Sequence, residues 1–297
     1  MELVTYDVPR RRADHEPLTI IPLGDIQWNG KNGPTALDIL KRTIDDGLER
    51  NAFFIGMGDY IDFMSPSNRQ KLRVAGFYDN TEDVIDEKAM ELTHEIYELA
   101  LKPTKGRWLG MLEGHHFSHL KSGDTTDMRL CQMLNTRFLG SSAIVRIVFD
   151  VCGSRITSNI WCHHGQGGGA SQGGPLNKLA GMAGGFEQID VMIMGHTCKM
   201  PADKLERVYV KWDSPDGPTL VKRTIALVNS GGFAKSLVVG NRQGQVPRGT
   251  YAEVGMMKPV PLGAPKIHIT PRIVDHRIPG NRSKRKRYSA HEITVEV

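Results

Sequence analysis

The sequence lacks the features that carry a protein into or across a membrane. No apolar run in its 297 residues reaches the roughly 18 residues that a membrane-spanning helix needs. Residues 1–17 are charged and have no apolar centre of the kind that signal peptides contain. These absences predict a cytoplasmic protein without a membrane partner.

Cysteine is scarce, and the usual cysteine and nucleotide motifs are missing. The four cysteines are scattered, with no C-x-x-C pair of the kind seen in zinc and redox sites. A chain of this length buries a full hydrophobic core without a disulfide scaffold, so we expect reduced thiols. The glycine-rich stretch at 166–174 lacks the G-x-x-x-x-G-K-[ST] pattern, which argues against a nucleotide-binding P-loop.

Acidic side chains are absent from residues 281–290, although this stretch is rich in basic ones. Its five basic residues equal the whole formal net charge of +5. They are Arg282, Lys284, Arg285, Lys286 and Arg287. Such tracts bind the phosphate backbone of nucleic acids, while a solvated tail is the simpler interpretation. We expect residues 280–297 to form a basic C-terminal segment with a possible last strand at 291–297.

Apolar segments that are present alternate with helical patterns in the first half of the chain. Strands are predicted at 18–23, 52–57 and 107–112, with helices at 36–50, 81–103 and 124–138. Later segments are mostly strands, at 143–149, 155–162, 191–194, 208–212 and 220–228, with one helix at 175–189. This order predicts an α/β fold, a layered β-sandwich flanked by helices. We expect one domain at 18–279, preceded by an N-terminal extension at 1–17.

Polar residues of the types that bind metals follow five of the predicted strands. These clusters are Asp25-Ile26-Gln27, Gly58-Asp59-Tyr60-Ile61-Asp62, Gly114-His115-His116, His163-His164-Gly165 and Gly195-His196-Thr197-Cys198. A single aspartate at a strand end is usually a turn residue, but five such clusters are hard to explain as turns. Strand ends at one edge of an α/β sheet are where sites form. The sequence therefore predicts a metal site built from these clusters.

The order of these motifs resembles that of the calcineurin-like metallophosphoesterases, in the prokaryotic and phage type. That family carries D-x-H, G-D-x-x-D, G-N-H, H-G and G-H-x-H in this order. The resemblance covers residues 24–232 and includes a glycine-rich loop after H-G and an Asn-x-Gly at 229–231. It implies a metallophosphoesterase-like fold and hydrolysis of phosphoesters by a water that two metals activate.

The resemblance also implies a role for each site residue. One metal would be bound by Asp25, Gln27, Asp59 and Cys198, and the other by Asp59, His115, His164 and His196. His116 matches the family's catalytic histidine, and Asp62 would orient either His116 or one of the metal ligands. The cofactors implied are two divalent ions, which could be Mn, Zn, Fe or Ni.

Three implied ligands depart from the family pattern. Gln27 and Cys198 stand where histidines are usual, and His115 stands where asparagine is usual. Cys198 would favour zinc or iron over magnesium as a ligand, or it is a packed thiol that binds no metal. Either His163 or His164 could be the ligand, although the glycine after His164 favours His164.

Two kinds of function fit these observations. The first is a dinuclear metal-dependent phosphoesterase (hydrolase), with phosphodiesterase or nuclease activity favoured by the basic tract. A phosphatase acting on small phosphomonoesters is a variant of it. The second is a binding or scaffold protein of the same fold that has lost one metal through Gln27 and Cys198. The metal content of the purified protein distinguishes the two.

Overall fold

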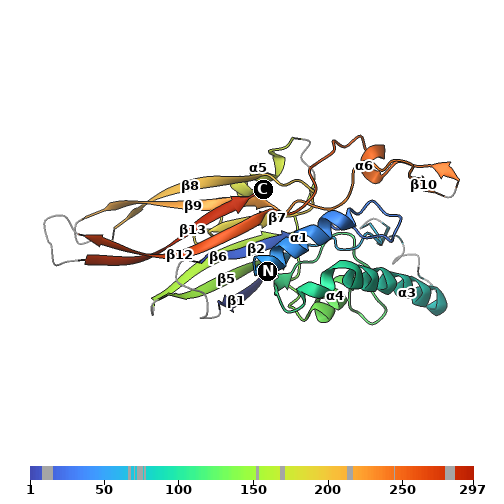
Figure 1. The fold of residues 1–297 in the computed structure, drawn as a ribbon, viewed down its shortest axis with the longest axis horizontal. Helices are drawn as coiled ribbons and strands as arrows, with labels where there is room; N and C mark the ends of the chain where they lie inside the picture. The colour runs from blue at the N-terminus through green and yellow to red at the C-terminus, as the bar shows by residue number, and fades with distance from the viewer. Residues whose placement is uncertain are drawn as a thin grey trace.

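The computed structural model describes residues 1–8, 16–65, 68–69, 71, 76, 78–151, 154–167, 171–212, 217–243, 245–277 and 285–297. These residues form a mixed α/β fold with two main sheets and helices on both outer sides (Figure 1). The layered α/β architecture predicted from the alternation of strands and helices is therefore present.

The first sheet has six strands in the order β1-β5-β6-β7-β9-β8. Their bounds are β1 Glu2–Asp7, β5 Ser142–Val151, β6 Ser154–His163, β7 Val191–Met194, β8 Ala202–Lys211 and β9 Thr219–Asn229. β5–β6 and β8–β9 are antiparallel pairs, whereas β6, β7 and β9 run parallel to one another. The carboxyl ends of β6 and β7 therefore meet at one edge of this sheet.

The second sheet has five strands in the order β13-β12-β2-β3-β4. Their bounds are β2 Leu18–Leu23, β3 Phe53–Gly56, β4 Trp108–Met111, β12 Lys266–Arg277 and β13 Arg285–Glu296. β2, β3 and β4 are parallel, and β12 pairs antiparallel with both β2 and β13. A small additional pair joins β10 Arg242–Gln243 to β11 Val246–Pro247.

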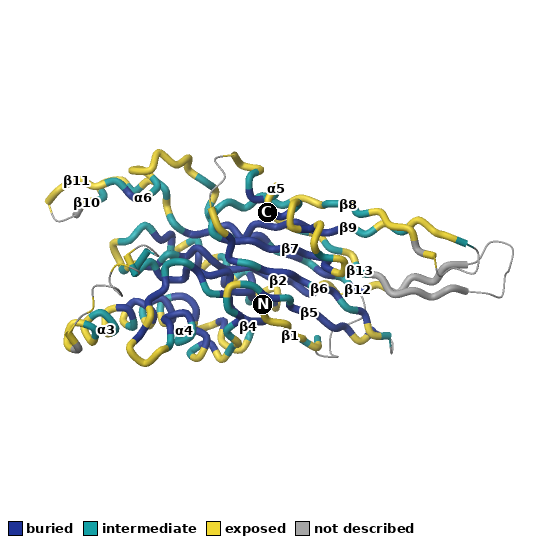
Figure 2. Tube along the Cα trace, turned by 180° about the vertical axis from the view of Figure 1, so that it is seen from behind, coloured by how far each residue is buried: buried dark blue, intermediate teal, exposed yellow. Residues whose placement is uncertain are grey.

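The main hydrophobic core lies between the two sheets. Ile20 and Ile55 from the five-stranded sheet pack in one cluster with Val145 and Ile193 from the six-stranded sheet. Figure 2 shows these central strands as the most deeply buried part of the chain. β2 is buried along its whole length because both of its faces are covered, which explains its unbroken apolar sequence.

Helices cover the outer face of each sheet. α1 Leu37–Glu49, α3 Asp79–Ile96 and α4 Thr126–Leu134 contribute to one apolar cluster with the outward side chains of β2 and β3. α5 Gly174–Ala183 packs Leu179 against Trp161 and Met192 of the six-stranded sheet. The short α6 Tyr251–Val254 lies apart from these layers (Figure 1). Within the described residues, none of the helices combines the length and apolar character required to cross a bilayer.

Several element boundaries differ from those predicted. The helix expected at 175–189 ends at Ala183, where Gly184 and Gly185 follow, because glycine is a poor helix former. The helix expected at 124–138 ends at Leu134, where Asn135 takes a left-handed conformation. The segment predicted at 208–212 is the end of a longer strand that begins at Ala202.

Both chain ends belong to the sheets. Residues 2–7, which were expected in an N-terminal extension, pair with β5 as β1. The last strand predicted at 291–297 is part of β13, which begins at Arg285. Three residues of the basic tract, Arg285, Lys286 and Arg287, are therefore strand residues, while Arg282 and Lys284 lie outside the described residues.

We predict that β1 contributes to stability through its inward face alone. Val4 is 8% exposed in the core and Leu3 is 72% exposed beside it. Val4→Ala should lower the free energy of unfolding by about 1–2 kcal/mol, because it removes two buried methyl groups. Leu3→Ala should change it by less than about 0.5 kcal/mol. Urea denaturation of the two variants measures the difference, and equal effects would contradict the integration of β1 into the sheet.

Candidate metal centre

The five clusters converge where the carboxyl ends of strands from both sheets meet. β2 leads to Asp25, β3 to Asp59 and β4 to His115 in the five-stranded sheet. β6 leads to His164 and β7 to His196 in the six-stranded sheet. The site therefore bridges the two layers of the sandwich.

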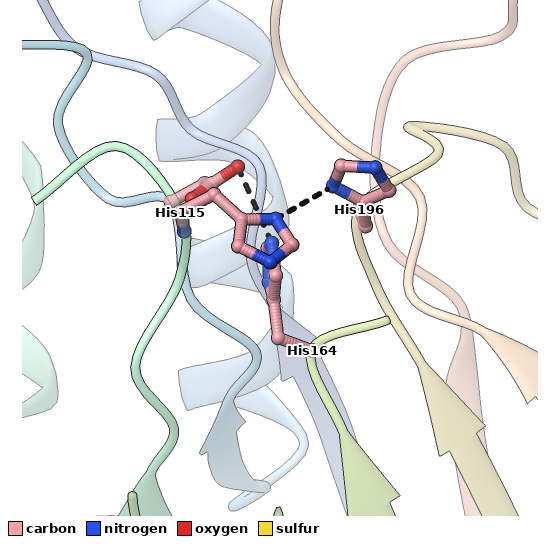
Figure 3. Close-up of side chains that lie close together, drawn as sticks. His115, His164 and His196 are labelled. Carbon is pink, nitrogen blue, oxygen red and sulfur yellow. Dashed lines mark hydrogen bonds and ion pairs between the residues drawn. The ribbon is translucent and has the colours of Figure 1, made fainter. Parts of the chain in front are cut away.

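Four of the predicted ligands form a compact group. The ligand atoms of Asp59, His115, His164 and His196 all lie within 4.8 Å of one another. Figure 3 shows how the three histidine rings of this group lie together. Nδ1 of His115 is 3.1 Å from Nδ1 of His196. Because metal–nitrogen and metal–oxygen bonds are about 2.0–2.2 Å long, these side chains could hold a metal ion with small adjustments.

Asp59 is the fixed centre of this group. Its Oδ1 accepts hydrogen bonds from the backbone N–H groups of both His115 and His116, the second at 3.0 Å. Its Oδ2 lies 3.4 Å from Nε2 of His164. Burial would raise the pKa of Asp59, but His164, His116 and the His115 N–H hold this pKa well below its usual range. The carboxyl group is therefore ionised and keeps one oxygen directed toward the histidines.

His164 is held with one ring nitrogen turned toward Asp59. Its Nδ1 donates to the carbonyl of Met57 at 2.6 Å, and its Nε2 is buried without a hydrogen-bond partner. Burial would lower the pKa of His164, but Asp59 raises it to about 9. A cation bound to Nε2 would take the place of that proton.

His163 points elsewhere. Its ring stacks on Trp161 with centroids 5.7 Å apart, and its Nδ1 accepts from the N–H of Gly165 at 2.7 Å. The structure thus places His164, and not His163, in the cluster, as the following glycine suggested.

The predicted ligands have unusual backbone conformations. Asp25, Gln27, Asp59, His196 and Cys198 all have positive φ angles, between 49° and 70°. They are five of the eight non-glycine residues with positive φ in the described chain. Non-glycine residues rarely adopt this region, and where they do, the strain often marks a functional site. Here the left-handed turn comes directly after a strand.

Two glycines leave the room that the cluster needs. A Cβ atom on Gly58 would lie 2.6 Å from Nδ1 of His164, and one on Gly114 would collide with Oδ1 of Asp59. The glycines of the G-D and G-H motifs are thus required by close approach between loops.

The side of the site around Asp25 is organised differently. Oδ2 of Asp25 accepts from the N–H of His196 at 2.9 Å, while its buried Oδ1 has no partner. Burial raises the pKa of Asp25 to about 7. The pKa of the Cys198 thiol is raised well above its usual value by burial and by the neighbouring carboxyl groups of Asp25 and Asp59. Asp25 is thus one of the groups that keep the Cys198 thiol protonated. The orphaned oxygen fits a cation, whereas the protonated thiol is a weak ligand.

Gln27 is fixed mainly through its backbone. Its N–H donates to the Asp59 carbonyl at 2.9 Å, and its own carbonyl accepts from the Thr35 hydroxyl at 3.0 Å. The compact group of Asp59 and three histidines does not include Asp25 or Cys198. The structure therefore supports the set containing the histidines more strongly than the set containing Asp25 and Cys198.

His116 lies beside the cluster and is paired with Asp62. Nδ1 of His116 is 2.7 Å from Oδ1 of Asp62, and its Nε2 is 3.9 Å from Oδ2 of Asp59. Burial would lower the pKa of His116, but Asp62 and Asp59 raise it above its usual value. This geometry matches the expected pairing, in which Asp62 orients the ring of His116.

Two residues that the sequence did not indicate support the loop at 113–117. Asp127, in the first turn of α4, accepts from the N–H of Gly114 at 3.1 Å. Arg69 donates to the carbonyls of Met64, His115 and Phe117. No motif marks either residue, because both act on backbone atoms far away in the sequence.

No protein-family model, curated protein or solved structure matches this chain in comparisons with known proteins. The assignment of a function therefore depends on the residues and geometry described above.

We predict that the two adjacent histidines differ sharply in metal binding. His164→Ala should lose most of its bound metal, because it removes a buried donor atom of the compact group. His163→Ala should keep a metal content near that of the unchanged protein. Elemental analysis after gel filtration in manganese or zinc measures this, with melting temperatures as the folding control. The opposite result would reassign the ligand to His163.

Proposed function

We propose that this protein is a metal-dependent phosphoesterase that favours phosphodiesters. The observation that carries the proposal is the convergence of Asp59, His115, His164 and His196 within 4.8 Å at the meeting edge of two sheets. The buried Asp25 Oδ1, which has no hydrogen-bond partner, supports it, because such an atom needs a cation or a hydrogen-bond partner. The motif order of the calcineurin-like family supports the same chemistry.

The residues present fit a pair of divalent ions sharing Asp59. Asp59, His115, His164 and His196 would hold one ion. Asp25 and Asp59 would hold the other, with Gln27 and Cys198 as further candidate ligands. When bound, such ions supply a nucleophile at neutral pH and neutralise charge on the phosphoryl oxygens. Mixed imidazole and carboxylate donors suit Mn, Fe, Ni or Zn.

The chain's own side chains orient His116 and keep it protonated. Asp62 accepts from Nδ1–H of His116 and so directs Nε2 of that ring toward Asp59 and the site. The raised pKa of His116 keeps a proton available there. His116 can donate this proton to the oxygen of a leaving alcohol, which is the role of a general acid.

A binding protein with one metal or none is the second candidate. It is favoured by the raised pKa of the Cys198 thiol, which burial and the nearby Asp25 cause, because a protonated thiol and an amide make a weak second site. The same observation leaves the histidine-rich site unaffected. A count of about one metal per chain without hydrolysis would support this candidate.

We expect hydrolysis of bis(p-nitrophenyl) phosphate in the presence of manganese, zinc or nickel, and weaker hydrolysis of p-nitrophenyl phosphate. His116→Ala should lower kcat on the diester by roughly 10²–10⁴-fold, the usual contribution of a general acid. Its metal content should stay unchanged, because His116 is outside the compact group.

Kinetics and elemental analysis of the unchanged protein and of His116→Ala, measured in parallel, test this prediction. His163→Ala is the matched control, because it removes an imidazole that faces away from the cluster. If none of the three metals supports hydrolysis, the enzyme proposal is overturned. A preference for the monoester would favour a phosphomonoesterase.

A nucleic-acid substrate or partner is part of the proposal through the basic tract. Deletion of 280–290 is unsuitable as a test, because β13 pairs with β12 from Arg285 onward. Substitution keeps the strand. Replacing the five basic residues by glutamine should weaken DNA or RNA binding and flatten its log–log salt slope by up to about 3–4 units. Hydrolysis of the small diester should not change.

The matched control removes the same number of exposed basic residues elsewhere. These are Lys31, Lys41, Arg42, Lys88 and Lys102. If both variants weaken binding equally, the tract is only part of the general charge. If the unchanged protein binds no nucleic acid at low salt, small phosphodiesters are the better substrate class.

A further inference from the structure

The loop that carries His115 and His116 is held from behind by one arginine. Nη1 of Arg69 is 2.8 Å from the carbonyl of Phe117 and 2.9 Å from that of Met64, and it also donates to the carbonyl of His115. The guanidinium carbon lies 3.9 Å from the centre of the Phe117 ring. Arg69 thus donates hydrogen bonds to the backbone on both sides of His116.

The peptide between His115 and His116 connects this arginine to the metal cluster. Its carbonyl, from His115, accepts from Arg69. Its N–H, from His116, donates to Oδ1 of Asp59 at 3.0 Å. In a planar trans peptide the C=O and N–H groups point in opposite directions within the plane, so Arg69 and Asp59 bind opposite edges of the same peptide group.

The orientation of this peptide decides how Asp59 is presented. If the plane reversed, Asp59 would face a carbonyl oxygen and lose a donor, and Arg69 would face an N–H group. Two hydrogen bonds on Oδ1 leave Oδ2 directed to His164 and His116. The positive charge of Arg69 favours the observed orientation.

A second contact ties the same segment to His116. The N–H of Phe63 points to the His116 carbonyl at 3.4 Å, and Asp62 binds the His116 ring. Phe63 and Arg69 therefore contact the carbonyls of His115, His116 and Phe117 between them.

We propose that Arg69 is a positioning residue that fixes the His115–His116 peptide and, through it, the carboxylate of Asp59 and the ring of His116. Its effect on turnover rests on the proposed phosphoesterase function, whereas its effects on the backbone and on metal affinity do not. Residues that orient metal ligands typically change metal affinity or activity by about 10–100-fold when they are replaced.

The first test is amide hydrogen exchange in the metal-free protein. In Arg69→Ala, the amides of His115 and His116 should exchange at least about tenfold faster, because the backbone that carries them is no longer held against Asp59. Arg42→Gln is the matched control, since it removes an arginine from an exposed pair with Asp38. Unchanged exchange at 115–116, or an equal increase throughout the chain, would overturn the proposal.

The second test is metal affinity and its chemical rescue. Mn²⁺ should bind Arg69→Ala about 10–100-fold more weakly, and added guanidinium at low millimolar concentration should restore part of that loss. Equal concentrations of sodium ion or urea should not restore the Mn²⁺ affinity of this variant. Arg69→Lys restores the charge without the fork of donors, so it should recover affinity only in part. Rescue by sodium would mean that charge alone acts and would overturn the positioning role.

Turnover is the third measurement. kcat on bis(p-nitrophenyl) phosphate should fall in Arg69→Ala, with less change in KM, because Arg69 acts through His116 and Asp59. If the unchanged protein hydrolyses no phosphoester, the proposed function fails while exchange and Mn²⁺ affinity still decide the role of Arg69. If Arg69→Ala does not fold, Arg69→Lys gives both measurements, and unchanged values there would reject the proposal.

Discussion

The geometry of the site depends on the two backbone hydrogen bonds that Oδ1 of Asp59 accepts. They join the end of β3 to the loop after β4, and they leave Oδ2 to face His164 from the other sheet. Desolvation alone would disfavour the charge of a buried carboxylate. His164 and His116, together with the His115 N–H, lower the pKa of Asp59 and keep it ionised. One carboxylate therefore connects loops from both layers of the sandwich, Oδ1 to the loop after β4 and Oδ2 to His164.

The fold tolerates strain at this edge because the layers behind it are rigid. Five of the proposed ligands have positive φ, which costs about 1–3 kcal/mol for each non-glycine residue. β2, β3 and β7 are buried along nearly their whole length and fix where each loop begins. The glycines at 58 and 114 then allow the loops to approach within contact of Asp59 and His164. Core packing and site geometry are thus two consequences of the same buried strands.

The sequence predicted the elements whose environment is uniform and missed those whose pairing is distant. β2 and β7 were predicted with their observed bounds, because strands covered on both faces are continuous apolar runs. β1 was missed because its mixed sequence forms a strand only by pairing with β5, far along the chain. β8 and β13 begin before their apolar residues do, so their polar halves gave no signal. At the site, Asp59, His115, His164 and His196 follow directly from strand ends. Arg69 could not be found, since its acceptors are carbonyls 46 and 48 residues away.

The two halves of the site differ in what they offer a cation, and this difference follows from donor chemistry. Around His164, a carboxylate and imidazoles present lone pairs that become available when protons leave, which suits borderline metals. Around Asp25, the raised pKa values of the carboxyl group and of the Cys198 thiol mean that protons compete strongly with a cation. Binding there must displace a proton from a desolvated group, so its affinity increases with pH and with the charge already present on Asp59. The group of Asp59, His115, His164 and His196 could therefore hold a metal ion with donors that are already gathered, whereas a cation beside Asp25 would also have to replace a proton on a buried carboxyl group.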